Sequence, residues 1–270
     1  MATVVDGRAI AREVLAEVAA QVALLPQAPR LSIVTCTPDF ATQRYLTLKQ
    51  RKAAEVGIRS RVIELLPEIS THALVSTVRT IAGSSDGVVV QLPLPAHIDR
   101  EAVLAAVPVS KDPDGFAYEN EPGACLPPVV GAIVEIAARH NVSFTGKRVA
   151  VVGAGRLVGA PAAHYLREHG AQVDIIEKGD RDRRQTLRAA DVIISGVGVP
   201  NLITAADVTD GVVVFDAGTA EANGKLAGDV APDVAARAAL ITPVPGGIGP
   251  LTVAVLLRNL VGLAQARSDV

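Results

Sequence analysis

Short apolar runs alternate with amphipathic stretches along most of the chain. Runs rich in β-branched residues predict strands, and apolar positions repeating every three to four residues predict helices. The first half predicts, in order, a helix at 7–22, a strand at 31–37, a helix at 38–54, a strand at 61–65, a helix at 70–82 and a strand at 87–92. Strands and helices that alternate at this spacing are typical of a parallel sheet with right-handed crossovers.

The second half repeats the alternation after a break. Residues 118–128 are rich in Pro and Gly and lack periodicity, which indicates a domain boundary. Beyond it we predict a helix at 129–140, strands at 147–152, 171–176, 192–195, 212–216 and 240–242, and a final apolar helix to about residue 266. The sequence thus predicts a two-domain α/β protein, with a first domain at 1–122, a second at 123–249, and a C-terminal helix at 250–270 that returns to the first domain.

Composition narrows the class of protein. The chain is 49% apolar, but its apolar residues fall in short runs, so we expect no membrane span. The first residues lack a basic segment followed by an apolar one, so we expect a cytoplasmic protein without a secretory signal. A net charge of −2, 3% aromatic residues and the absence of Trp argue against a surface that binds nucleic acid. Cys36 and Cys125 match no metal spacing and are expected to be reduced thiols, and we expect no metal.

The strand at 87–92 predicts one end of a ligand site. Its apolar run ends in Gln91 and two prolines, which cannot continue a ladder of hydrogen bonds, so Gln91 is expected at the carboxyl end of a strand. Ligands of open α/β sheets bind at that edge. An Asp-Pro-Asp-Gly turn at 112–115 can bring Asp114 to the same place. A core strand followed by an ordinary acidic turn is an equally open interpretation of these residues alone.

A second candidate pair lies on the predicted helix at 38–54. Tyr45 and Lys49 are four residues apart and therefore share one helix face, with Thr42 one turn earlier. Taken alone, such a pair is more typical of a solvated lysine beside a half-buried tyrosine. The helix follows directly from a strand, however, and so begins at the ligand-binding edge of the sheet, which favours a site.

The second domain opens with glycines typical of dinucleotide binding. The run Gly153-Ala-Gly155-Arg-Leu-Val-Gly159 follows a strand, and glycines there let the backbone approach a pyrophosphate at a helix amino end. Its G-x-G-x-x-x-G spacing is a variant of the usual fingerprint. Glu177 ends the next strand, where an acidic side chain can bind ribose hydroxyls. The alternative is that the glycines only permit close packing of helix on strand.

The tail contains a stiff loop, Pro243-Val-Pro245-Gly-Gly-Ile-Gly-Pro250, before the final helix. A loop with so few side chains suits a place where backbone lies close to a flat ligand. A plain turn before a C-terminal helix is the common alternative.

Several motifs occur together in one order: Ala41-Thr-Gln-Arg-Tyr45 with Lys49, Asp86-Gly-Val-Val-Val-Gln-Leu-Pro-Leu-Pro95, Lys111-Asp-Pro-Asp-Gly115, Gly224-Lys-Leu-Ala-Gly-Asp229, and Pro245-Gly-Gly-Ile-Gly-Pro-Leu-Thr252. In this the chain resembles the bifunctional methylenetetrahydrofolate dehydrogenase/methenyltetrahydrofolate cyclohydrolase family along nearly its whole length. The resemblance implies a catalytic folate-binding first domain, a Rossmann-type second domain that binds NAD(P), a cleft between them, and usually a homodimer.

The resemblance also implies an activity and a role for individual residues. Relatives of this kind oxidise 5,10-methylenetetrahydrofolate to the methenyl form and hydrolyse it to 10-formyltetrahydrofolate. Lys49 would be the central catalytic group, with Tyr45 orienting it and stacking on the folate, Gln91 bonding to it, and Asp114 binding the pterin-like ring. The remaining implied substrate contacts are Leu92, Pro245, Gly246 and Gly247. The implied dinucleotide contacts are Gly153, Ala154, Gly155, Arg156, Val158, Gly159, Glu177, Lys178 and Thr219.

Some positions depart from the family pattern. The family usually has Gly-Arg-Ser at 153–155 and a His-Ser-Arg type run at Glu177-Lys178, and those side chains serve the 2′-phosphate of NADP. Glu177 would repel that phosphate and favour NAD, unless Arg156, Lys178 or the arginines at 181–184 compensate. Thr219-Ala220 also replaces the usual Ile-Asn.

Two alternatives to a bifunctional enzyme stay open. One is a specialised paralogue with a single activity or an altered cosubstrate, and the other is a non-catalytic protein that binds folate or dinucleotide. Retention of Lys49, Gln91 and Asp114 together argues against the second, because a pure binder does not need the lysine.

Overall fold

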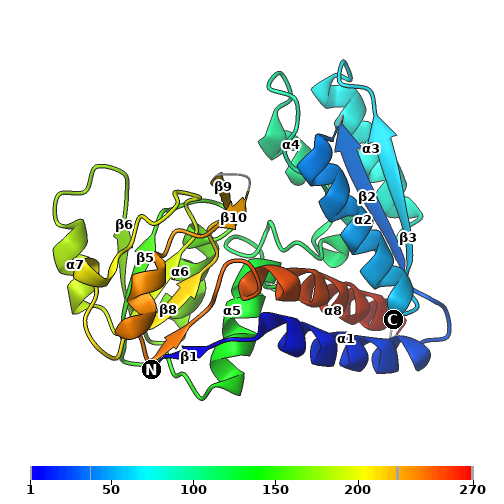
Figure 1. Cartoon of the computed structure of the whole chain (residues 1–270). Coiled ribbons are helices and arrows are strands. Elements are labelled where there is room, and N and C mark those ends of the chain that lie inside the picture. The colour runs from blue at the N-terminus through cyan, green and yellow to red at the C-terminus, as the bar shows by residue number, and fades with distance from the viewer. Residues whose placement is uncertain (1, 37, 223–224, 269–270) are drawn as a thin grey trace. The chain divides into compact units, whose positions relative to one another are not determined.

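The computed structural model describes residues 2–36, 38–222 and 225–268, and its contacts divide the chain into two compact units (Figure 1). The six-stranded unit comprises Met1–Ala11 and Val129–Thr252. The three-stranded unit comprises Arg12–Pro128 and Val253–Val270. These units follow from packing, and the functional domain boundaries expected at 122/123 and 249/250 remain a prediction.

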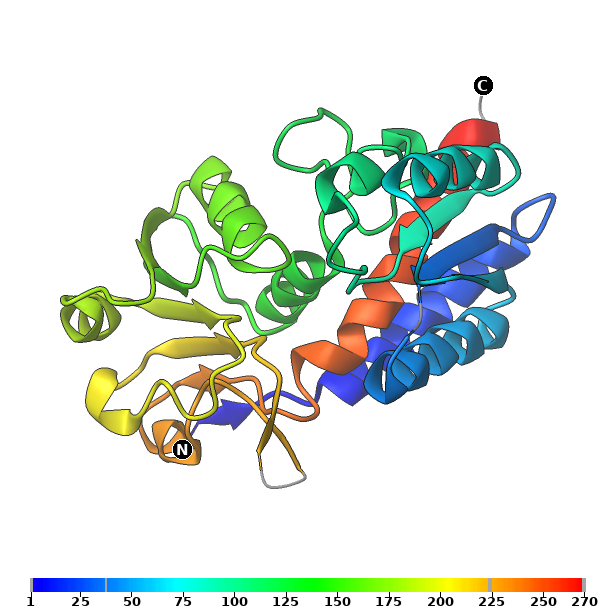
Figure 2. The same cartoon turned by 90° about the horizontal axis from the view of Figure 1, so that it is seen from above.

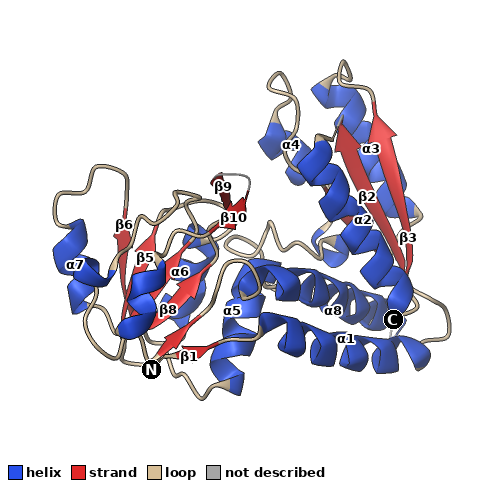
Figure 3. Cartoon of the chain, viewed as in Figure 1, coloured by secondary structure: helices blue, strands red, loops and turns tan. Residues whose placement is uncertain are grey.

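The three-stranded unit is built on a small parallel sheet, drawn in red in Figure 3. Its strands are β3 (Arg59–Leu65), β2 (Arg30–Cys36) and β4 (Gly87–Val90), in that spatial order, and Val34 of β2 pairs with both Ile63 and Val90. Its helices are α2 (Phe40–Glu55), α3 (Thr71–Gly83), α4 (Arg100–Leu104) and the short 3₁₀ turn η1 (Val109–Lys111).

Local sequence determines where these helices begin. Asp39, Ser70 and Asp99 precede α2, α3 and α4, and each side chain accepts a hydrogen bond from a backbone N–H in the first helical turn. Such caps satisfy donors that a helix start leaves without partners. The apolar faces of α3 and α4 then pack with β2 and β4 in one buried cluster.

The six-stranded unit carries the larger sheet, which is parallel throughout. In spatial order its strands are β1 (Thr3–Val4), β11 (Leu240–Ile241), β8 (Val213–Asp216), β7 (Val192–Ser195), β5 (Arg148–Val152) and β6 (Gln172–Ile176). The other elements are α5 (Pro128–Arg139), α6 (Gly159–Glu168), α7 (Arg183–Ala189), the 3₁₀ turns η2 (Ala205–Asp207) and η3 (Pro232–Ala236), and the hairpin of β9 (Ala220–Ala222) and β10 (Lys225–Ala227).

The expected α/β fold with parallel sheets is confirmed, and the differences have local causes. β4 ends at Val90 rather than at residue 92, because Pro93 has no N–H to extend the ladder. No sequence pattern indicated β1, whose two residues are exposed and too short to show a period. Its backbone pairs with β11 at the edge of the sheet, where the Thr3 N–H donates to the carbonyl of Ala239 at 2.8 Å. The expected end of β2 at Thr37, like Gly224 of the motif at 224–229, lies outside the described residues.

The last helix, α8 (Ile248–Ser268), returns to the three-stranded unit as expected. There it lies beside α1 (Gly7–Ala23), as both views show (Figure 1 and Figure 2). Gly87 has no side chain where Leu260 packs, and a Cβ there would collide with it. The expectation that no stretch could span a bilayer needs correction, because Ile248–Arg267 is long and apolar enough by composition. Burial of 61% of its most apolar window inside the protein accounts for that composition.

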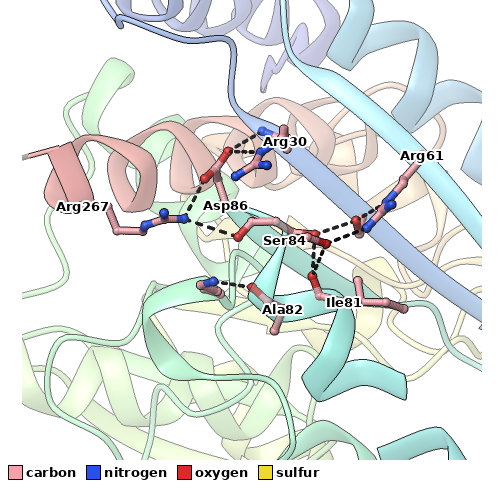
Figure 4. Close-up of polar contacts among 10 residues, drawn as sticks. Arg30, Arg61, Ile81, Ala82, Ser84, Asp86 and Arg267 are labelled. Atoms are coloured by element: carbon pink, nitrogen blue, oxygen red, sulfur yellow. Dashed lines mark hydrogen bonds and ion pairs between the residues drawn. The ribbon is translucent and has the colours of Figure 1, made fainter. Parts of the chain in front are cut away.

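Asp86 joins α8 to the amino edge of the small sheet (Figure 4). Its carboxylate accepts a hydrogen bond from Arg267 Nη1 at 2.7 Å and from the backbone N–H of Arg30 at 2.8 Å, and it pairs with Arg30 Nε at 3.3 Å. Lys111 donates to the carbonyl of Ala82 nearby. Burial and the neighbouring Arg267 lower the pKa of Lys111, and Asp86 opposes that shift.

We expect Asp86→Ala to lower the free energy of unfolding by about 1–2 kcal/mol, because two half-exposed guanidinium groups lose their shared acceptor. Urea unfolding at low and at high salt measures this, and the loss should shrink at high salt. Asp210→Ala, which removes an exposed pair with Arg237, serves as the control and should change stability by less than about 0.5 kcal/mol. Equal losses in both variants would remove the special role of Asp86.

Candidate active site

A buried lysine is the centre of the site in the three-stranded unit. α2 places Tyr45 and Lys49 on one face, and the Lys49 Nζ lies 4.7 Å from the centroid of the Tyr45 ring. The same Nζ donates a hydrogen bond to Gln91 Oε1 at 3.1 Å. Only 5% of Lys49 is exposed, so an aromatic face and an amide oxygen replace most of the water around its amine.

The orientation of Gln91 follows from its place at the end of β4. Its backbone N–H donates to the carbonyl of Val34 at 2.8 Å, which holds the residue at the carboxyl edge of the sheet. Its side-chain Nε2 donates to the carbonyl of Leu92 at 2.7 Å. With the amide nitrogen engaged in this way, the amide oxygen faces Lys49.

Asp114 adds negative charge to this site. Burial raises the pKa of its carboxyl, and the attraction of Lys49 lowers it in part. Among the described residues, none donates a hydrogen bond to this carboxylate, so both oxygens are available to a ligand that carries N–H groups. Tyr45, Lys49, Gln91 and Asp114, which the sequence singled out separately, therefore act on one another in the folded unit.

Asp112, two residues earlier, has a different environment. It is 3% exposed, and its carboxylate accepts hydrogen bonds from the backbone N–H groups of Asp114, Gly115 and Phe116. Burial, together with the negative charge of Asp114, raises the pKa of Asp112 to about 6. Burial and Asp112 raise the pKa of Cys125 to about 12, so this cysteine stays a thiol. Sequence reasoning missed Asp112, although an aspartate opening a turn before glycine is a known signal.

The predicted loop at Pro245, Gly246 and Gly247 belongs to the six-stranded unit. Gly246 has φ +116°, which favours glycine, and Gly247 donates its N–H to the carbonyl of Pro243 at 2.8 Å. The carbonyl of Gly247 lies where a Cβ on Gly7 would be. The loop is therefore tightly packed on the start of α1, and its contact with a substrate remains a prediction.

The glycine run in the same unit has the features of a pyrophosphate cradle. Gly153 follows β5 with φ +89°, and a Cβ on Gly159 would collide with the Gly153 carbonyl, so these two glycines serve close packing. A Cβ on Gly155, by contrast, would meet nothing within 4 Å. Val158 is the N-cap of α6, and its side chain makes no capping bond to the N–H groups there. At the start of α6 the Ala160 N–H donates to the Gly155 carbonyl at 3.1 Å and Pro161 has no N–H, so the open backbone at Gly155 is the feature that fits a bound pyrophosphate.

The other predicted dinucleotide contacts lie within this glycine run or elsewhere in the six-stranded unit. Glu177 and Lys178 are exposed directly after β6, as the sequence predicted, while Ala154 is exposed and Arg156 is partly buried. Thr219 is exposed between β8 and β9. Val158 is buried against Gly196, where it leaves no room for a larger residue. Among the described residues, no group of three His, Cys, Asp or Glu side chains is arranged to hold a metal.

Comparison with known proteins decides the family. A family model described as the tetrahydrofolate dehydrogenase/cyclohydrolase catalytic domain matches residues 5–114, and its NAD(P)-binding domain partner matches residues 127–268. The chain belongs to the tetrahydrofolate dehydrogenase/cyclohydrolase family. Bifunctional protein FolD of Lacticaseibacillus casei is 38% identical, and the alignment covers 100% of both chains.

Solved structures of the tetrahydrofolate dehydrogenase/cyclohydrolase family agree. The bifunctional FolD enzyme of Campylobacter jejuni superposes with a TM-score of 0.95 at 32% identity, over 99% of this chain and 100% of that one. The Trypanosoma brucei enzyme, solved with NADP and an inhibitor, gives 0.93 at 34% identity, over 100% and 99%.

Two buried aspartates organise the loops of the NAD(P)-binding domain. Asp229 is fully buried and accepts hydrogen bonds from Ser195 Oγ and from the N–H groups of Val197 and Val199, each at 2.7–2.8 Å. Asp216, at the end of β8, accepts from three further backbone N–H groups at 2.9–3.2 Å. Burial raises the pKa of Asp216 to about 6. These bonds tie the ends of β7 and β8 together at the edge where dinucleotides bind.

We expect Asp216→Asn to flatten the dependence of stability on pH. The pKa of Asp216 is about 6 in the folded chain, against an ordinary value of 3.8 for an aspartate, so its stabilising contribution is present below about pH 4 and lost as pH rises through about 6. This pKa difference of about 2 corresponds to about 3 kcal/mol in the free energy of unfolding. Between pH 4 and 7 the free energy of unfolding of the wild type, measured in urea, should therefore fall by about that much more than that of the variant. Parallel profiles would contradict the assignment.

Proposed function

We propose that this chain oxidises 5,10-methylenetetrahydrofolate to 5,10-methenyltetrahydrofolate with NAD(P) and hydrolyses the product to 10-formyltetrahydrofolate. The observation that carries the proposal is the buried Lys49 amine, held by Gln91 and Tyr45, in a chain that matches both domains of a dehydrogenase/cyclohydrolase family. A protein that only bound folate would gain nothing from burying an amine at its ligand edge.

Lys49 performs the proton transfers of hydrolysis. Water adds to the methenyl carbon and loses one proton. The bond from that carbon to N5 then breaks as the new hydroxyl loses its proton to become the formyl oxygen, and N5 gains one proton, so that 10-formyltetrahydrofolate and one net proton result. In this proposal the Lys49 amine lies at the reacting carbon, accepts the proton of the attacking water and returns one to the folate nitrogen. Gln91 keeps the amine in place, and Tyr45 offers its ring to the folate.

Asp114 recognises the ring system of the folate. Its carboxylate lacks donors from the described residues, while a pterin-like ring presents an amino group and ring N–H groups side by side. Such charge-assisted hydrogen bonds favour one orientation of the ring and therefore set which carbon faces Lys49. Leu92, Pro245, Gly246 and Gly247 complete the proposed substrate contacts.

The NAD(P)-binding domain holds the cosubstrate in this proposal. The backbone around Gly155 and the start of α6 receive the pyrophosphate, and Glu177 accepts hydrogen bonds from the adenosine ribose. When bound, the dinucleotide supplies the hydride acceptor. Residues 1–122 with 250–270 form the folate domain and residues 123–249 the dinucleotide domain of a cytoplasmic homodimer.

Cosubstrate choice is the point at which this chain can differ from its relatives. Glu177 places a negative charge where the 2′-phosphate of NADP would come, and like charges at such a contact are unfavourable unless a guanidinium group neutralises them. We therefore propose that the enzyme uses NAD at least as well as NADP.

We expect Lys49→Met to abolish methenyl hydrolysis, because the side chain can no longer exchange a proton, while dehydrogenase activity persists in part because hydride transfer depends more on alignment. The assay follows methenyl absorbance and its decay with 5,10-methylenetetrahydrofolate and either NAD or NADP. Lys52→Met, which changes a lysine on the same helix that pairs with Glu55, is the control and should keep both activities. Unchanged hydrolysis in folded Lys49→Met would exclude Lys49 from the mechanism.

We expect Glu177→Ser to raise kcat/KM with NADP relative to NAD by about tenfold or more, because a repulsive charge is removed from the phosphate position. Steady-state kinetics with each dinucleotide measures the ratio. Glu168→Ser is the control, because Glu168 lies at the C-terminal end of α6, and this variant should leave the ratio unchanged. A wild-type enzyme with strong NADP preference would overturn the proposal and point to Arg156 or to the arginines at 181–184 as phosphate ligands.

A further inference from the structure

The turn that carries Asp114 is fixed from inside by one buried carboxylate. Asp112 Oδ1 accepts from the N–H groups of Asp114 at 3.1 Å and Gly115 at 3.0 Å, and Oδ2 accepts from Phe116 at 2.7 Å. Three consecutive N–H groups thus converge on one side chain. A carboxylate bound in this way has little acceptor capacity left and, at 3% exposure, is shielded from a ligand.

The same turn is fixed from outside by α8 and by the loop at Cys125. Asn259 Nδ2 donates to the carbonyl of Pro113 and to the carbonyl of Leu126, both at 2.9 Å. Gly115 has φ +67°, and a Cβ there would collide with the carbonyl of Cys125. The backbone on both sides of Asp114 therefore has one arrangement, whereas its own carboxylate is left without donors from the described residues.

We propose that Asp112 is a positioning residue for the folate, which acts by holding the backbone of Asp114 in the orientation that binds the ring, and that Asn259 of α8 supports it. The inference rests on the proposed folate role of Asp114. It assigns the two acids of the Asp-Pro-Asp-Gly turn opposite tasks. The Asp112 oxygens accept hydrogen bonds from the backbone, whereas the Asp114 oxygens are available to accept them from the ligand.

A double-mutant cycle tests whether Asp112 works through Asp114. Asp112→Asn keeps the size of the side chain but replaces one acceptor oxygen with a donor that faces N–H groups. We expect the KM for 5,10-methylenetetrahydrofolate to rise about tenfold or more, with kcat changed less than about threefold and the KM for the dinucleotide unchanged. In an Asp114→Ala background, Asp112→Asn should add less than about twofold, because the group it positions is gone.

Amide hydrogen exchange of the protein without ligand gives a readout independent of catalysis. The N–H groups of Gly115 and Phe116 should exchange about tenfold or more faster in Asp112→Asn than in the wild type, whereas those of α3 should not change. Asp99→Asn, which alters a cap of α4 in the same unit, is the matched control and should change neither the folate KM nor exchange in the turn. Asn259→Leu, a second variant of similar size, should raise the folate KM in the same direction.

The outcomes separate this inference from the proposed function. If Asp114→Ala alone leaves the folate KM unchanged, the folate role of Asp114 is wrong and the inference fails with it. If Asp114→Ala weakens folate binding but Asp112→Asn adds its full effect on top, Asp112 does not act through Asp114, and only the inference is overturned. Unchanged exchange at Gly115 and Phe116 in Asp112→Asn would likewise overturn it.

Discussion

Buried carboxylates that accept backbone N–H groups are the interaction on which the functional loops of this protein depend. Asp112 does this for the turn that carries Asp114, and Asp229 and Asp216 do it for the loops after β7 and β8. A loop at a ligand-binding edge cannot use the sheet ladder to satisfy its backbone donors, so a side chain must supply the acceptors. An ionised acceptor gives stronger hydrogen bonds than a neutral one, and the cost of burying it is visible in the raised pKa of Asp112 and Asp216.

The site around Lys49 is arranged on a different principle. Its amine contacts a neutral amide oxygen and an aromatic ring, and it attracts the carboxylate of Asp114, which accepts no hydrogen bond from the described residues. The amide partner orients the amine without adding a formal charge beside it, so a hydrogen bond and an aromatic contact set the direction in which Lys49 points.

Much of this site follows from the sequence because its signals are local. Tyr45 and Lys49 share a face through helical spacing, and two prolines place Gln91 at the end of a strand. Long-range partners had no such signal. β1 joins a strand from a distant part of the sequence, and Asn259 reaches two carbonyls that lie 146 and 133 residues away from it. The sequence left both a packing and a binding interpretation open for the glycine run at 153–159. The contact of Gly159 with the Gly153 carbonyl supports packing, and binding at the open space beside Gly155 stays a prediction.

The division of the chain into units has a consequence for its synthesis. The six-stranded unit takes its edge strand β1 from the first residues but is complete only at Thr252, and the three-stranded unit also needs the helical turns after Val253. On the ribosome, therefore, the small sheet is made before α8 and lacks the partner that Arg267 provides for Asp86 until Arg267 has been synthesised. Domains that are contiguous in sequence can fold one after another as they emerge. In this chain the earlier segment 12–128 cannot complete its packing until the segment after Val253 has been made, so loss of α8 would leave the earlier segment without its packing partner.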